Sequence, residues 1–265
     1  MIIKDIKKTL DLWHKGFLLN VSSEMAYRAS FVFIVFALIA MDLVGPLVGY
    51  LIYGSSKGIP GWSFMEFLLF QGVILFNFGF WHAFIGGISW TTQELINEGE
   101  LDIVMTKPFH ILANIASRAT DFHGITEALV GLALIIYAIA KLQLGGWMLV
   151  PFGLLIFIAL IFMLSISIVL AALAIVFVKV GALQNIIWSL NDLVSWPISI
   201  YGNGMRFFLT FIIPAAISSY WPAAILMGKE PLSKLGIVTI PVMIFLAFSL
   251  VLWNIVLKRY QSAGG

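Results

Sequence analysis

The sequence predicts an all-α polytopic membrane protein that forms a single transmembrane domain over residues 1–265. Hydrophobic residues make up 61% of the chain and charged residues only 11%, less than half of the roughly 25% that soluble domains carry. The apolar residues form continuous runs of roughly 20 or more, the length that an α-helix needs to cross about 30 Å of hydrocarbon. These runs lack the short alternating pattern of membrane β-barrel strands.

The composition excludes several kinds of site. The chain has no cysteine, which rules out disulfides, thiolate metal sites and a cysteine nucleophile. The net charge of +2 gives no support for a nucleic-acid partner. The first residues are charged and are not followed by a short apolar core with a cleavage site, so we expect no cleaved signal peptide.

Residues 4–20 are predicted to form an amphipathic helix in the headgroup plane of the membrane. Apolar and charged residues repeat at spacings of three and four on different faces, as Ile6, Leu10, Trp13 and Phe17 against Lys4, Lys8, Asp11 and Lys15. A helix with one apolar and one largely cationic face suits the membrane interface. A solvated N-terminal arm is the alternative.

Six transmembrane helices are expected to follow, over 28–54, 64–92, 115–140, 148–178, 184–204 and 236–257. The apolar stretch 206–227 lies between the fifth and sixth helices, begins at Arg206, and is interrupted by Pro214 and Pro222. Each proline removes a helix hydrogen bond and clashes with the preceding turn. We therefore expect a re-entrant or surface hairpin that is buried against other helices, where its broken backbone is satisfied. A seventh span is the alternative.

The Lys and Arg residues predict the orientation, because cytoplasmic loops carry an excess of both. With six spans and both termini in the cytoplasm, the cytoplasmic side holds Lys4, Lys7, Lys8, Lys15, Arg28, Lys107, Arg118, Lys179, Lys258 and Arg259. The outer side then holds Lys57, Lys141, Arg206, Lys229 and Lys234. The imbalance favours this orientation.

Acidic residues cluster in the cytoplasmic loop 93–112, between the second and third spans. The loop carries Glu94, Glu98, Glu100 and Asp102, and then Lys107 and Pro108. A turn at Gly99 is expected to lead into a short helix, with Asp102 near its start, where a carboxylate stabilises free N–H groups. Met105 would be exposed unless a partner covers it. The loop is therefore either a docking element for a soluble partner or a solvated turn.

Three stretches resemble the permease subunits of type-2 ABC transporters, in their small six-helix branch. They are GIPGWSFMEFLLFQG (58–72), INEGELDIVMTKPFHILANIASR (96–118) and FIIPAAISSYWPAAILMG (211–228). The pattern of Gly-x-Leu-Asp followed by a basic residue and Pro stands here as Gly99, Leu101, Asp102, Lys107 and Pro108. Gly61-Trp62 precedes the second span, and Pro214 and Pro222 match the outer prolines. The resemblance covers the whole chain in order.

The resemblance implies an N-terminal elbow helix, a cytoplasmic coupling helix and re-entrant outer helices. It also implies two separate ABC ATPase subunits that hold ATP and Mg, and a second permease, identical or homologous. This chain has no G-x-x-x-x-G-K-[ST] phosphate loop, so it is not expected to act as an enzyme itself. The implied location is the cytoplasmic (inner) membrane of a prokaryote, in contact with lipids, and the implied role is export of a hydrophobic or amphipathic substrate.

The same resemblance assigns residues to three regions. The expected ATPase-coupling residues are Glu94, Glu98, Gly99, Glu100, Leu101, Asp102, Met105, Lys107 and Pro108. The outer re-entrant gate would include Arg206, Pro214 and Pro222. The candidate pathway residues are Gln71, Asn77, Asn185 and Asp192.

Three further observations leave alternatives open. Asp42, Glu127 and Asp192 fall within predicted spans, where they either hold helices together, are protonated, or line a substrate path. No two of His14, His82, His110 and His123 have the spacing of a helical metal site, and His82 either lines a cavity or packs helices. Gly45, Gly49, Gly86 and Gly87 either permit close helix approach or mark flexible points.

Two other functions remain as alternatives. A channel or secondary transporter would work without an ATPase. A polytopic lipid-modifying enzyme would need a convergent catalytic set at one membrane face, and the only dense set, 94–102, has no histidine and no nucleophile motif.

Overall fold

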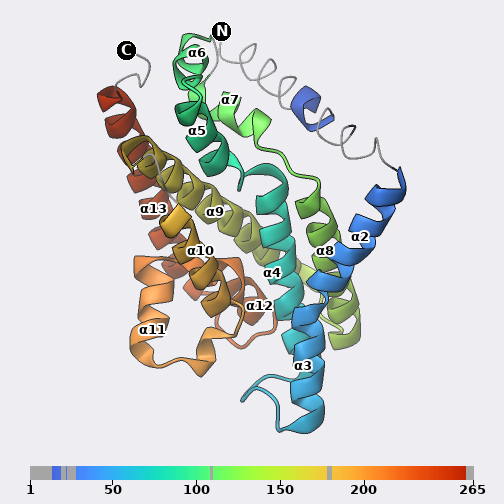
Figure 1. The fold of residues 1–265 in the computed structure, drawn as a ribbon. Helices are drawn as coiled ribbons and strands as arrows, with labels where there is room; N and C mark the ends of the chain where they lie inside the picture. The colour runs from blue at the N-terminus through green and yellow to red at the C-terminus, as the bar shows by residue number, and fades with distance from the viewer. Residues whose placement is uncertain (1–13, 19–21, 23–27, 108–109, 178–180, 261–265) are drawn as a thin grey trace.

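The computed structural model describes residues 14–18, 22, 28–107, 110–177 and 181–260, and within these ranges the chain is helical and has no strand (Figure 1). The elements are α2 (Arg28–Asp42), α3 (Val44–Ser55), α4 (Phe64–Phe84), α5 (Ile88–Asn97), α6 (Leu101–Thr106), α7 (Ile111–Arg118), α8 (His123–Leu142), η1 (Gly146–Met148), α9 (Leu149–Phe177), α10 (Gly181–Val194), η2 (Ile198–Ile200), α11 (Asn203–Phe207), η3 (Phe208–Ile212), η4 (Ala215–Ser218), α12 (Tyr220–Leu226) and α13 (Lys234–Arg259).

Five segments of the described chain are long and apolar enough to cross a membrane: Ser30–Ser55, Phe64–Asn97, His123–Leu142, Gly146–Phe177 and Lys234–Arg259. They match five of the six predicted spans in order, so the chain is a multi-pass membrane protein. The segments containing α4 and α9 are the most buried of the five. These two helices therefore form the centre of the bundle, and the other spans pack around them.

The prediction of one continuous span over 184–204 is wrong. Helix α10 ends at Val194 after 14 residues, which is about 21 Å of helix and less than the hydrocarbon thickness. Pro197 follows closely, and it disfavours helical backbone at the residue before it. Apolar composition continues through this region, but the backbone cannot continue as a helix.

The predicted third span, 115–140, also begins later than expected. Residues up to Arg118 belong to the separate helix α7, and α8 starts at His123. The chain between them is anchored by a hydrogen bond of 3.0 Å from the Asp121 N–H to the Ala83 carbonyl at the end of α4.

Helices α4 and α8 pack so closely that only glycine fits at their contact. A Cβ atom placed on Gly79 would lie 2.2 Å from the Ala128 nitrogen, and one on Gly124 would lie 2.2 Å from the Ala83 nitrogen. A Cβ on Gly131 would meet the Phe76 nitrogen at the same distance. Small residues let helix backbones approach in membranes, where packing drives association.

The segment between α10 and α13 is broken into short helices, as its prolines predict. Pro214 precedes the 3₁₀ turn η4, and Pro222 lies in the first turn of α12, where a missing N–H costs little. Every residue from 214 to 226 is buried. The segment therefore packs against α4 and α9 as a plug of short helices.

The two ends of the bundle differ. Helix α6 and the C-terminal end of α13 lie at one end, whereas α11 and the chain after α3 lie at the other (Figure 1). Of the predicted interfacial helix 4–20, only residues 14–18 are described, and they are helical. Phe17 contacts Phe84 at the end of α4, with 5.9 Å between ring centroids.

Candidate functional site

The loop between α5 and α7 forms a compact helical corner. Gly99 has φ +71°, a conformation that favours glycine, and it turns the chain from α5 into α6. Asp102 lies in the first turn of α6, as predicted. Leu101 and Val104 are buried in an apolar cluster that includes Ile115 of α7. This cluster fixes α6 to the body of the protein.

The outward face of α6 is apolar and differs from the prediction at one residue. Ile103 is 57% exposed and Met105 is 38% exposed, whereas Leu101 is fully buried. Because a partner can contact only exposed side chains, Ile103 and Met105 form the apolar surface, and Leu101 belongs to the core. Sequence reasoning missed Ile103, because residues two apart in a helix do not face the same way, and a surface predicted from Leu101 and Met105 leaves Ile103 out.

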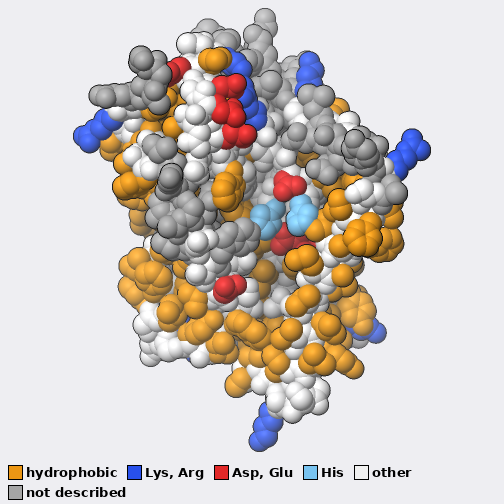
Figure 2. Space-filling model, in the orientation of Figure 1, with side chains coloured by type: hydrophobic (Ala, Val, Ile, Leu, Met, Phe, Trp, Pro, Cys, Tyr) orange, Lys and Arg blue, Asp and Glu red, His pale blue; other side chains and the backbone are white. Residues whose placement is uncertain are grey.

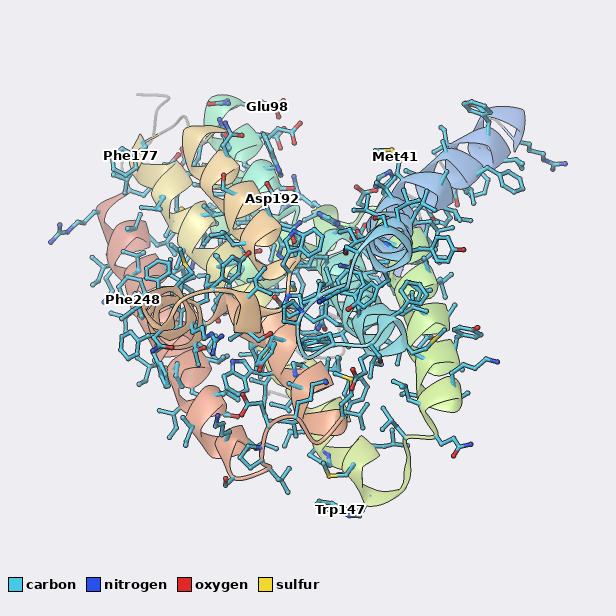
Figure 3. The ribbon with its side chains drawn as sticks, turned by 90° about the horizontal axis from the view of Figure 1, so that it is seen from below. Met41, Glu98, Trp147, Phe177, Asp192 and Phe248 are labelled. Carbon is cyan, nitrogen blue, oxygen red and sulfur yellow. The ribbon has the colours of Figure 1, made fainter. Side chains whose placement is uncertain are left out.

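The acidic side chains of this corner differ in their exposure and in their partners within the chain. Glu94 and Glu98 are exposed, and Figure 3 shows Glu98 at the edge of the molecule. Glu100 lies 3.6 Å from the Arg118 guanidinium, so it already forms an ion pair within this chain. Lys107 ends α6 in extended backbone, and the prediction at Pro108 lies outside the described residues.

The opposite end carries the predicted outer gate. The Arg206 guanidinium donates hydrogen bonds to the Ser199 and Tyr201 carbonyls and therefore holds η2 against α11. The Lys229 ammonium lies 2.8 Å from the Glu66 carboxylate and joins the end of α12 to the start of α4. Burial raises the pKa of the Tyr220 phenol, and the nearby Glu230 carboxylate adds to the rise.

A cavity of about 710 Å³ opens among α2, α3, α4, α5, α8 and α10. On the face shown in Figure 2, two histidines and several carboxylates gather in a hollow between apolar surfaces. Its walls include the aromatic side chains Phe78, Trp81, Trp90 and Trp196. Its volume lies within the roughly 300–1,000 Å³ range of small-molecule sites.

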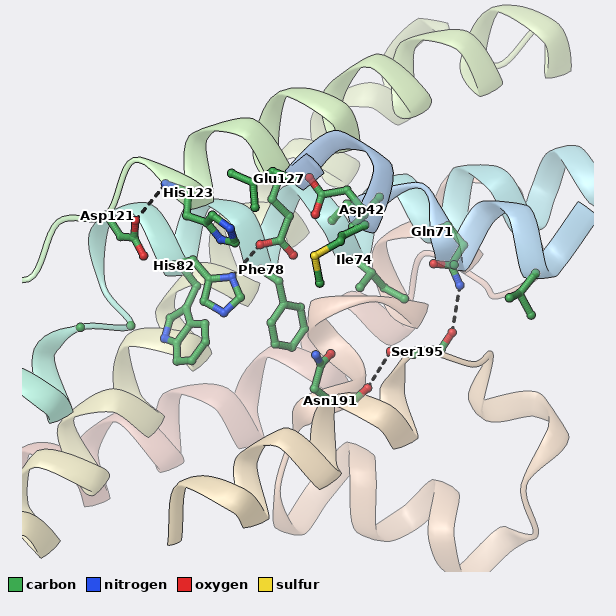
Figure 4. Close-up of a pocket in the computed structure, with 18 of the residues that line it drawn as sticks. Asp42, Gln71, Ile74, Phe78, His82, Asp121, His123, Glu127, Asn191 and Ser195 are labelled. Carbon is green, nitrogen blue, oxygen red and sulfur yellow. Dashed lines mark hydrogen bonds and ion pairs between the residues drawn. The ribbon is translucent and has the colours of Figure 1, made fainter. Parts of the chain in front are cut away.

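Three different spans each contribute an ionisable side chain to this cavity: Asp42, His82 and Glu127. His82 Nδ1 and Glu127 Oε2 are 2.6 Å apart and link α4 to α8. Figure 4 shows Asp42 and His123 beside this pair. Asp121 lies at the rim, where its carboxylate accepts a hydrogen bond from the His123 N–H. Ionisable groups inside a membrane are costly and usually functional.

The four predicted pathway residues do not gather together. Gln71 lines the cavity and donates a hydrogen bond of 3.1 Å to the Ser195 carbonyl. Asn77 is fully buried and donates to the Ser218 carbonyl, so it joins α4 to η4. Asn185 and Asp192 are exposed on α10, and it is the neighbouring Asn191 that lines the cavity.

Sequence reasoning considered Asp42, Glu127 and His82 one at a time and did not predict that the three side chains line one cavity. One usable signal was the spacing of His123 and Glu127, four residues apart and hence on one face of α8. The other half of the cluster comes from α2 and α4, and no spacing within the sequence reports which helices are neighbours.

The comparisons with known proteins agree with this architecture. Residues 36–264 match the family model described as ABC-2 family transporter protein. No curated protein and no solved structure matches the chain. The family match includes all five apolar segments except the first residues of the first one. The chain therefore belongs to the ABC-2 family of transporter proteins and is a membrane-spanning permease component.

Proposed function

We propose that this permease is the transmembrane subunit of an ATP-driven exporter of hydrophobic or amphipathic compounds. The complex contains two separate ATPase subunits, one of which binds the α5–α7 corner of this chain, and a second permease, identical or homologous, completes the pathway. The complex lies in a prokaryotic cytoplasmic membrane with both termini of this chain in the cytoplasm. Family membership supports ABC ATPase partners in general, and the α5–α7 corner is the surface that suits them.

The observation that carries this proposal is the outward face of α6. Ile103 and Met105 project from a helix that is otherwise held by buried Leu101 and Val104. Glu94 and Glu98, on α5 and at its end, are exposed in the same corner of the chain. An apolar centre with a charged rim is the usual composition of a protein interface, and the acids would select a basic partner surface.

The corner is also connected to the cavity. Buried side chains of α5, α6 and α7 share one apolar cluster with α9 and α13, and α5 follows α4 after only a short turn at Gly86 and Gly87. Helix α4 in turn supplies His82, Trp81 and Gln71 to the cavity wall. A displacement applied at α6 by ATP hydrolysis would therefore move a wall of the cavity.

The proposal is tested by affinity purification of the tagged full-length chain from its native membrane in mild detergent, with mass spectrometry of the co-purified proteins. We expect an ABC ATPase to co-purify with the wild-type chain. Met105→Asp should reduce its recovery about tenfold or more, because a carboxylate would be desolvated in the interface.

Met205→Asp is the matched control, because Met205 has nearly the same exposed fraction, 39% against 38% for Met105, but lies on α11 at the other end of the bundle. Its ATPase recovery should equal that of the wild type. Recovery of the chain without any ATPase, in a detergent that preserves other ABC complexes, would contradict the proposal and favour a transporter that works without ATP.

A further inference from the structure

We propose that the cavity between α2, α4, α8 and α10 binds an organic cation that carries apolar groups. This inference rests on the proposed transport function and adds the charge of the transported compound.

The charge of the lining is one-sided. The described lining residues include the carboxylates of Asp42, Asp121 and Glu127 and include no Lys or Arg. The lining also holds His82, which is paired with Glu127 at 2.6 Å, and His123; even with both imidazoles charged, the three carboxylates would outnumber the cations. The Asp42 Oδ2 atom is buried and has no hydrogen-bond partner among the described residues. Negative charge therefore remains in excess on the cavity wall.

A positively charged ligand would stabilise these carboxylates. A carboxylate away from bulk water is costly unless it is paired or hydrogen-bonded, and Asp42 and Glu127 both lie within candidate membrane spans. A cation that enters the cavity would provide that pairing, whereas an anion would be repelled. The lining thus selects the sign of a ligand's charge as well as its size.

The remaining walls favour an organic cation over a metal ion. Among the described residues, no three His, Asp or Glu side chains are grouped as metal ligands. Phe78, Trp81, Trp90 and Trp196 instead present aromatic surface. Aromatic faces attract cations, most strongly where water is excluded, and they also pack against apolar substituents. A volume of about 710 Å³ holds a ligand far larger than a single ion.

The test is equilibrium binding to the purified full-length permease in detergent, with radiolabelled tetraphenylphosphonium as the probe. Tetraphenylborate serves as a matched ligand, because it has nearly the same shape and the opposite charge. We expect saturable binding of tetraphenylphosphonium and little binding of radiolabelled tetraphenylborate, which is measured in a separate sample because the two ions form a sparingly soluble salt. Equal binding of the two ions would overturn the assignment of charge.

Three variants locate the site, and a fourth controls for lost charge elsewhere. Asp42→Asn and Glu127→Gln should each weaken binding about tenfold or more. Glu66→Gln removes a carboxylate from α4 outside the cavity and keeps an oxygen for the Ser63 N–H, so its binding should match that of the wild type. Trp90→Ala, at an exposed position on the rim, should also weaken binding and is least expected to disturb folding.

Unchanged affinity in the Asp42, Glu127 and Trp90 variants would place the cation elsewhere and overturn the inference. The binding assay needs no ATPase, so it fails or succeeds independently of the co-purification experiment. An ATPase partner without cation binding would leave the exporter proposal standing and remove this one. Cation binding without an ATPase partner would support the cation site and contradict the exporter proposal.

Discussion

Glycine decides how closely α4 approaches α8. Gly79, Gly124 and Gly131 each lie where a Cβ atom would be 2.2 Å from a backbone nitrogen of the facing helix. Such a contact involves backbone on both sides, so no rotamer change relieves it. The close approach brings His82 and Glu127 within hydrogen-bond distance, and the packing glycines thus position the polar pair in the cavity.

Gly79→Ala should therefore destabilise the protein by about 1–3 kcal/mol, the usual cost of overpacking a close contact. The measurement is the apparent melting temperature of the detergent-solubilised protein. Gly153→Ala is the control, because a Cβ on Gly153 of α9 meets nothing within 4 Å and alanine is the better helix former. Equal melting temperatures for the two variants would contradict the predicted contact.

At the scale of elements, apolar composition predicted where helices lie but not where they end. Helix α10 stops at Val194 because Pro197 follows, and the 206–227 segment divides at its prolines, as expected. The corner from α5 to α6 follows the prediction closely, because a glycine, an acid and the end of an apolar run mark it locally. Leu101 is the exception, since its burial depends on α7.

The turn at Gly99 supplies a test of the α5–α6 corner. Gly99 has φ +71°, and no atom lies within 4 Å of a Cβ placed on it. A substitution there is therefore disfavoured by the backbone conformation and not by a clash. Gly99→Val should lower the recovery of a co-purified ATPase, because a β-branched residue is a strong outlier at positive φ. Gly99→Asn should retain it, since asparagine tolerates this region. Equal recovery with both variants would show that the turn does not position α6.

At the scale of the whole molecule, the described chain forms a bundle with two distinct ends. One end carries the acidic corner of α5–α7, and the other carries the buried plug of η4 and α12 with the ion pair of Lys229 and Glu66. The cavity lies between them, among helices whose lining residues are up to about 150 residues apart in the sequence. This arrangement suits a permease driven from one end.

The absence of cysteine allows a direct test of which end faces the cytoplasm. Asn97→Cys, exposed beside the acidic corner, should react with a membrane-impermeant maleimide only after the cells are permeabilised. Lys57→Cys, exposed at the opposite end, should react in intact cells. The wild-type chain provides the unlabelled control. The opposite labelling pattern would reverse the proposed orientation.

The sequence by itself determined that the chain is a helical membrane protein, placed five of its spans, and located the acidic corner and the broken segment 206–227. These properties depend on composition and on residues near one another in the chain, such as Gly99 or Pro214. Only the tertiary structure decided that α10 is short, that Leu101 is buried, and that Asp42, His82 and Glu127 share one cavity. Such facts depend on which helices are neighbours. In a membrane, the neighbours of a helix are set by how well packed surfaces fit together, and the hydropathy of the sequence does not record that fit.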